Sequence, residues 1–203
     1  MVKKIYSASL VSKRFWFYEF KQYINLLNAG KSDAEIKKIN EETNIFGAVS
    51  NSRANEIYNT CKKRASILGN GIQKLFPELS IDNQKILLLV AVLLLNDLFT
   101  EFLEEVYQKQ IRRGDLTLTN ANYNAFFSEK QRTIDIVSTW KPYTYIKLGN
   151  SYRMYLFEAG LIQKNKTDDI ITPKIVDTRV IDWLRKINRL DIAKALIGEE
   201  IEG

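Results

Sequence analysis

Apolar side chains recur every three or four residues along most of this chain, which is the spacing that gathers them on one face of a helix. Only 9 glycines and 3 prolines interrupt 203 residues, so helices joined by short turns are expected. Ser32, followed by Glu35, and Thr119 are signals for helix starts. The third helix is expected to begin at Ser50 or Asn51 and the apolar helix at Ser80 or Asp82. The expected helices cover residues 15–28, 32–42, 50 or 51–68, 80 or 82–96, 98–113, 119–130, 133–137, 139–158, 178–187 and 190–197.

One stretch predicts a helix that is followed by a β-hairpin. Thr139 is expected to cap this helix, Pro142 suits its first turn because no N–H is needed there, and Gly160 suits a left-handed end. Two short strands, 161–163 and 170–172, flank a polar turn. This order is typical of the end of a winged helix-turn-helix, which binds duplex DNA, and equally of an ordinary helix and hairpin in an α+β domain.

The most apolar stretch is residues 86–95, which lies between Lys85 and Asn96. A membrane-spanning helix needs about 20 apolar residues, so this run is too short. We therefore expect a buried helix and no membrane span. The first twenty residues lack the apolar core of a secretory signal.

Composition favours an anionic partner. The chain has 30 basic and 24 acidic residues, a net charge of +6 and a pI of about 9.2. Apolar residues make up 45%, enough for a real core. A single cysteine, Cys61, excludes an internal disulfide and fits a reducing compartment.

The charge is uneven and suggests four regions. Residues 1–75, a helical helix-turn-helix region, carry net +7, and the winged-helix-like region 116–176 carries net +3. The apolar helical middle 76–115 carries net −3, and the C-terminal helical tail 177–203 carries net −1. Because the two regions with helix-turn-helix patterns are the basic ones, the pattern favours nucleic acid as partner. The expected fold is mostly α, with a short β-hairpin in the winged-helix-like region.

The N-terminal helix-turn-helix pattern offers one candidate DNA-binding site. Arg53 and Asn55 lie near the start of its second helix, where such side chains can pair with guanine and adenine edges. Lys62, Lys63 and Arg64 follow on the same helix and suit contacts to phosphates. The alternative for all five residues is an ordinary solvated helix face.

The winged-helix-like region offers the second candidate site. Lys141, Lys147 and Arg153 belong to its expected recognition helix, and Lys164 and Lys166 belong to the hairpin turn. We expect these five cations to face the duplex and to contact phosphates.

The residues that catalysis usually needs are missing from the sequence. The chain contains no histidine, which removes most zinc sites and the Ser-His-Asp mechanism. Gly69-Asn70-Gly71 is not followed by the lysine of a phosphate loop. Cys61 lies beside basic residues but lacks a partner base, so a plain helix cysteine is the better interpretation. We expect no catalytic site, no metal and no cofactor.

Three groups of short motifs follow one another along roughly residues 5–175. They are Tyr6-Ser7-Ala8-Ser9-Leu10 with Phe15 and Glu19-Phe20; Gly114-Asp115-Leu116 with Thr119, Phe126 and Glu129; and Trp140, Thr144, Leu148 and Leu156 with Glu158-Ala159-Gly160-Leu161-Ile162. Their order and spacing resemble the BrxA family of the BREX anti-phage systems.

The resemblance implies a mostly helical cytoplasmic protein with helix-turn-helix elements that binds DNA. The resemblance also implies that the protein acts together with a methyltransferase, an ATPase and other large BREX proteins. The family has no catalytic motif that could be assigned to residues of this chain. We therefore expect a non-catalytic protein that binds double-stranded DNA with little sequence preference. A protein–protein adaptor whose basic faces dock acidic partners is the alternative, and RNA binding is a third possibility. The oligomeric state and the role of residues 177–203 stay open.

Overall fold

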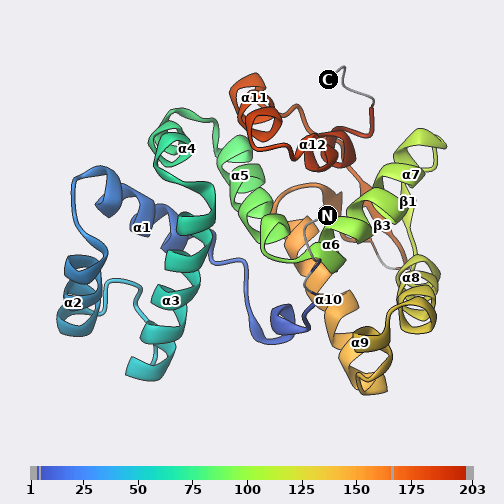
Figure 1. The fold of residues 1–203 in the computed structure, drawn as a ribbon, viewed down its shortest axis with the longest axis horizontal. Coiled ribbons are helices and arrows are strands. Elements are labelled where there is room, and N and C mark those ends of the chain that lie inside the picture. The colour runs from blue at the N-terminus through green and yellow to red at the C-terminus, as the bar shows by residue number, and fades with distance from the viewer. Residues whose placement is uncertain (1–3, 5, 166, 200–203) are drawn as a thin grey trace. The chain divides into compact units, whose positions relative to one another are not determined.

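The fold is mostly helical, as expected, with one small antiparallel sheet (Figure 1). The computed structural model describes residues 4, 6–165 and 167–199.

The chain forms two compact units rather than four regions. We call Trp16–Leu95 the helical unit, and we call Met1–Phe15 together with Asn96–Gly203 the mixed unit. The boundary expected at residue 75 is absent because the apolar helix after it packs into the helical unit. The first fifteen residues belong instead with the C-terminal half of the chain.

Serine caps begin three helices of the helical unit. Ser32, Ser50 and Ser80 each accept a hydrogen bond from the backbone N–H three residues further on. Ser32 and Glu35 form the expected capping box. The elements of this unit are α1 (Phe17–Asn28), α2 (Asp33–Thr43), α3 (Asn51–Leu68), α4 (Asn70–Leu75), the 3-10 turn η2 (Phe76–Glu78) and α5 (Ile81–Leu94).

Helix α3 is the centre of the helical unit, since it packs against α1, α2 and α5. Aromatic edges join these elements: the Phe20 and Phe76 rings lie 5.5 Å apart and the Tyr23 and Tyr58 rings 6.0 Å apart.

Helix α5 is buried on every side over residues 86–93, which confirms the prediction for the apolar run. Among the described residues, no single helix has the length and apolar content to cross a bilayer, although the bent pair Ile81–Leu94 and Asp97–Arg112 meets that test when the two are taken together.

The mixed unit contains a longer series of short elements. The helix expected over residues 98–113 is divided by a π-helical turn, and Thr119 caps the next helix in a capping box with Asn122. The elements are η1 (Ser9–Ser12), α6 (Asp97–Phe102), the π turn η3 (Leu103–Tyr107), α7 (Gln108–Arg112), β1 (Thr117–Leu118), α8 (Asn120–Thr133), α9 (Asp135–Ser138), α10 (Pro142–Glu158), β2 (Ile162–Gln163), β3 (Asp169–Ile171), α11 (Thr178–Lys186) and α12 (Leu190–Ile197).

Helix α10 begins later than the sequence suggested. Thr139 does not cap it; its hydroxyl donates a hydrogen bond to the Ile136 carbonyl at the end of α9. The helix starts instead with Pro142 in its first turn, after Lys141 in an extended conformation. At the other end Gly160 has a φ of 78°, the left-handed conformation that was expected there.

The sheet contains the expected hairpin and one further strand. Strands β2 and β3 pair antiparallel, with Ile162 opposite Ile171, and they match the predicted strands to within one residue. Strand β1 pairs with the other edge of β3, with Thr117 opposite Ile170, so the order is β1-β3-β2.

Aromatic rings fill the core of the mixed unit. The Phe99 ring stacks on Tyr152 of α10 with centroids 4.1 Å apart, and the Phe102 ring stacks on Tyr123 of α8 at 4.9 Å. These contacts fix the buried face of α10 against α6 and α8, so the opposite face of α10 is the exposed one.

The N-terminal segment is held in the mixed unit by buried polar contacts. The Glu101 carboxylate pairs with Lys4 at 2.7 Å and with Lys130 at 2.7 Å, and it accepts a hydrogen bond from the Tyr6 hydroxyl at 2.8 Å. Burial alone would raise the pKa of Glu101, but the hydrogen bonds from Lys130, Lys4 and Tyr6 outweigh burial and lower the pKa below its ordinary value.

The C-terminal helices also belong to the core of this unit. Helix α12 packs against η3 and α7, and Gln108 donates a hydrogen bond to the Lys194 carbonyl. Gly198 follows α12 with a φ of 83°, and a Cβ there would lie 2.4 Å from Ile111 Cγ2. The sequence left the role of residues 177–203 open; the described part of this tail covers α7 and the π turn.

Candidate nucleic-acid interface

The exposed face of α10 is a narrow stripe opposite the aromatic core. At 100° per residue, Tyr143, Ile146, Asn150 and Phe157 fall on one side of the helix, and all four are exposed. We call these four residues the α10 stripe. Between Pro142 and the end of the helix the only carboxylate is Glu158, so an anion meets little repulsion along the stripe.

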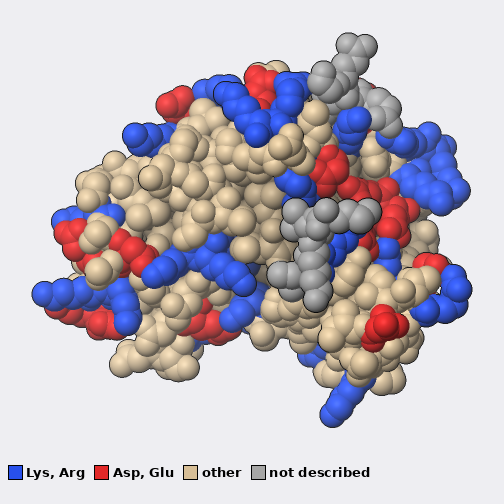
Figure 2. Space-filling view, in the orientation of Figure 1, with Lys and Arg blue, Asp and Glu red and all other residues tan. Residues whose placement is uncertain are grey.

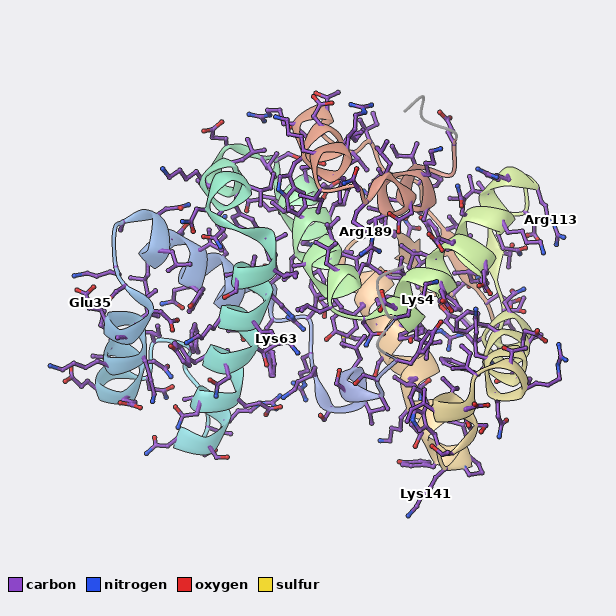
Figure 3. All side chains as sticks on the ribbon, in the orientation of Figure 1. Lys4, Glu35, Lys63, Arg113, Lys141 and Arg189 are labelled. Carbon is purple, nitrogen blue, oxygen red and sulfur yellow. The ribbon has the colours of Figure 1, made fainter. Side chains whose placement is uncertain are left out.

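Lysines flank the α10 stripe. Lys141 lies just before α10 and projects away from the α9–α10 corner (Figure 3). The Lys147 ammonium lies 5.1 Å from the centre of the Tyr143 ring, and that of Lys164 in the hairpin turn lies 4.4 Å from the Phe157 ring. Within the described residues, none of these three lysines forms an ion pair with a carboxylate. They are therefore available cations beside an uncharged strip of surface.

Arg153 does not face outward as predicted. Its Nε lies 2.5 Å from Asp169 Oδ2 on β3, and its guanidinium also donates to Asn120 Oδ1 at 2.8 Å. Asp169 is buried, so this pair joins α10 to the hairpin and to the start of α8. Arg153 thus connects α10 to the hairpin and to α8, and its charge is neutralised by Asp169. Lys166, the other predicted contact in the turn, lies outside the described residues.

A groove runs beside the α10 stripe, between α8 and α10. Its volume is 360 Å³, and three asparagines line it: Asn120 and Asn124 from α8 and Asn150 from α10. Ile146 and Arg153 also lie on its edge. The groove therefore presents amide donors and acceptors rather than carboxylates.

Helices α2 and α3 of the helical unit, where the sequence predicted a helix-turn-helix, have a different arrangement. Arg53 is paired with Glu56 at 2.6 Å, and its guanidinium lies 4.7 Å from the centre of the buried Trp16 ring. Asn55, two residues later, is half-buried. The sequence left two interpretations of these residues open, base reading and a solvated helix face, and in this conformation the Arg53 guanidinium is held by Glu56 and the Trp16 ring.

The three consecutive cations of α3 have three different surroundings. Lys62 is paired with Asp33 of α2, and Lys63 is exposed without an ion-pair partner among the described residues. Arg64 is only 3% exposed and lies 6.0 Å from the Trp16 ring, so the prediction that it offers a surface charge is wrong. Its position in the sequence carried a signal, because Ile57, Cys61, Arg64 and Leu68 follow the three-to-four spacing of one buried face.

The lysines of α2 are also paired with carboxylates. Lys37 pairs with Glu41 and Lys38 with Glu42 across one helical turn, and Figure 2 shows basic and acidic side chains intermixed over this helix. Around Asp33, burial would raise its pKa, but hydrogen bonds from Lys62, Tyr23 and Tyr58 lower the pKa overall. The surface of α2 and α3 thus alternates in sign.

Reactive groups are scarce in the described part of the chain. Burial raises the pKa of the Cys61 thiol to about 12, so the reactive thiolate is a minor species at neutral pH. Within the described residues, no three of the side chains His, Cys, Asp and Glu come together as a metal site would require.

The sequence signals missed the uncharged part of the site. Tyr143, Ile146 and Asn150 were not predicted as contacts, although their spacing of three and four residues places them on one helix face. The exposed fractions, 63% for Tyr143 and 61% for Ile146, identify them as surface residues despite their apolar character. Asn120 and Asn124 were missed because their approach to α10 depends on the packing of two separate helices.

Comparison with known proteins identifies the family. The family model described as BrxA matches residues 4–188, and the chain belongs to this family. A curated relative named BREX protein BrxA, from Bacillus cereus (strain H3081.97), is 30% identical over 200 residues, covering 98% of this chain and 100% of the relative.

A solved structure has the same fold. It is an uncharacterized protein from Magnetospirillum magneticum, with a TM-score of 0.80 and 18% identity, covering 96% of this chain and 99% of that one.

Proposed function

We propose that this chain is a non-catalytic protein that binds double-stranded DNA within a BREX anti-phage system, beside other BREX proteins. The observation that carries the proposal is α10 with its hairpin, where lysines without carboxylate partners among the described residues flank an exposed helix face. Family membership and the BREX relative support the defence setting. The lack of histidine and the buried state of Cys61 support the absence of catalysis by this chain alone.

The order of elements supports groove insertion by α10. Helix α7, strand β1, helices α8, α9 and α10, and the hairpin β2–β3 follow one another, with β3 between β1 and β2 in the sheet. This order is compatible with a winged helix-turn-helix, in which the recognition helix before the hairpin enters the major groove. Lys141 and Lys147 would then contact phosphates on either side of the groove, and Lys164 would contact the backbone from the wing.

Exposed apolar residues favour a second candidate, the protein–protein adaptor. Ile136 on α9 and the stripe residues Tyr143 and Ile146 are more than half exposed, which is typical of surfaces that meet a protein partner. In that case DNA affinity would be absent, and substitutions in the stripe would reduce binding to other BREX proteins.

A salt titration with a random-sequence duplex tests the proposal. We expect Lys147→Ala with Lys164→Ala to weaken binding about tenfold and to reduce the slope of log affinity against log salt by about 2, because two phosphate contacts are lost. Lys37→Ala with Lys38→Ala is the matched control, since it removes the same charge from α2, where both lysines are paired.

Three outcomes would contradict the proposal in different ways. Absence of DNA binding at low salt would reject it and leave the adaptor. Equal weakening by the test pair and the control pair would place the interface elsewhere. Equal competition by duplex RNA would favour the RNA-binding alternative, because A-form RNA presents a major groove too narrow for α10.

A further inference from the structure

The α10 stripe carries at its centre an aliphatic side chain that suits a base rather than a phosphate. Ile146 is exposed and aliphatic, and no described group forms a hydrogen bond with the Asn150 side chain. Phosphates are bound by charge and by donors, whereas an exposed aliphatic group gains nothing from a phosphate. Lys141 and Lys147 lie at the margins, where they suit the backbone. When α10 lies in a DNA groove with its lysines against the two backbones, its uncharged stripe faces the base edges at the bottom of the groove.

We infer that the α10 stripe gives the chain a preference for A·T base pairs in the major groove, with Ile146 contacting a thymine methyl group and Asn150 contacting adenine. This inference rests on the proposed DNA binding and adds a modest base preference to an otherwise sequence-independent affinity. Thymine is the base that presents a methyl group in the major groove, and an amide side chain pairs with adenine N6 and N7.

The spacing of the two residues suits adjacent steps of one duplex. Ile146 and Asn150 are four residues apart, about 6 Å along the helix axis, which corresponds to roughly two base pairs at about 3.4 Å each. The same helix could therefore contact a thymine and an adenine within one short A·T stretch.

The charges around the stripe disfavour G·C reading at its centre. Guanine is read by arginine or lysine, but Arg153 is held by Asp169 and Asn120, and Lys141 and Lys147 lie at the margins of the stripe, where they suit phosphates. Cytosine is read by carboxylates, and the α10 stripe has none. The groove beside the stripe adds Asn120 and Asn124, which extends the amide character and adds no charge.

Replacing thymine by uracil in a duplex tests the inference directly, because the change removes only the methyl group from the major groove. We expect wild-type protein to bind an A·T-rich duplex about fourfold more tightly with thymine than with uracil, the factor that burial of one methyl group contributes. Ile146→Ala should bind both duplexes equally. Asn150→Ala should lose about tenfold in its preference for the A·T-rich duplex over a G·C-rich duplex.

The controls separate this inference from the proposed function. Ile146 and Asn150 are exposed, so both variants should unfold at the wild-type temperature. If wild type binds all duplexes equally, the base preference is wrong and DNA binding stands. If Ile146→Ala is as sensitive to uracil as wild type, the methyl effect arises from DNA shape and the contact is wrong. If wild type binds no duplex, the inference fails together with the proposed function.

Discussion

Along α2 and α3 of the helical unit, most cations lie within reach of a carboxylate, whereas the lysines around α10 lie beside aromatic rings. Lys37, Lys38, Arg53 and Lys62 are all ion-paired within their unit. Lys147 and Lys164 contact the Tyr143 and Phe157 rings, and among the described residues neither is paired with a carboxylate. Both regions follow a helix-turn-helix spacing, so the spacing alone does not distinguish a stabilised surface from a binding surface.

The net charges of the two units agree with this contrast. The helical unit has 10 basic and 8 acidic residues, net +2, and the mixed unit has 20 and 16, net +4. The difference is small compared with the difference in pairing. An ion pair on the surface offers a phosphate little attraction until its carboxylate is displaced, so local pairing decides where an anion binds.

The two units also differ in how deeply they bury an ion pair, and this gives the largest expected effect. Glu101 is 7% exposed and Lys130 is 10% exposed, whereas the Asp33 and Lys62 side chains are 35% and 48% exposed. We expect Glu101→Gln to lower the free energy of unfolding by roughly 3 kcal/mol, because Lys130 loses a buried partner. Asp33→Asn should cost roughly 1 kcal/mol. Chemical denaturation of the two variants measures both values.

Wild type and the matched variant Glu105→Gln serve as references for this prediction. Glu105 also pairs with Lys130, but its side chain is 48% exposed, so its loss should cost much less than that of Glu101. If Glu101→Gln, Glu105→Gln and Asp33→Asn all destabilise the protein equally, the burial of the ion pair does not determine how much it contributes to stability.

Acid should affect both pairs in the same direction. The pKa values of Glu101 and Asp33 are lowered in the folded protein, below ordinary values of 4.5 and 3.8. Their stabilisation is therefore present above those ordinary values and is lost as the pH falls through the folded pKa values. We expect the melting temperature of the wild type to decrease once the pH is below about 4, and the gap between wild type and Glu101→Gln to narrow as the pH decreases further. A gap that widens as the pH falls from about 6 to about 3 would contradict the lowered pKa of Glu101, because only a raised pKa makes the carboxyl stabilising in acid.

Much of the fold could be predicted from local signals. The Ser32 and Thr119 caps, the Gly160 helix end, the hairpin and helix α12 all depend on residues close together in sequence. Strand β1 could not be predicted, because two residues carry no periodicity and are held by β3 about fifty positions later. The π turn η3 was also missed, and it packs against α12, which lies far along the chain.

The sequence predicted which residue types form the candidate site, but it could not predict which of the cations are ion-paired. The sequence identified Lys141, Lys147 and Lys164 as cations near a helix and a hairpin. It could not show that Arg153 pairs with Asp169, sixteen residues away on β3, because that contact requires the hairpin to fold back on α10. Pairing is a tertiary property, and it decides which of several similar cations remains available.

The smallest expected effect concerns the cations of α3. Lys62→Ala with Lys63→Ala should weaken binding to a random-sequence duplex only about twofold and change the salt slope by less than 1, because Lys62 is paired with Asp33 and only Lys63 is available. Arg185→Ala with Lys194→Ala, in the tail, removes the same charge and provides the baseline. Thermal stability should drop slightly, since one half-exposed ion pair is lost.

If Lys62→Ala with Lys63→Ala weakens binding as much as Lys147→Ala with Lys164→Ala, then α3 also contacts DNA, and a DNA phosphate must displace Asp33 from Lys62. The single variant Asp33→Asn distinguishes these cases, because it keeps Lys62 and frees it from its partner, and it should strengthen binding only if α3 lies at the interface.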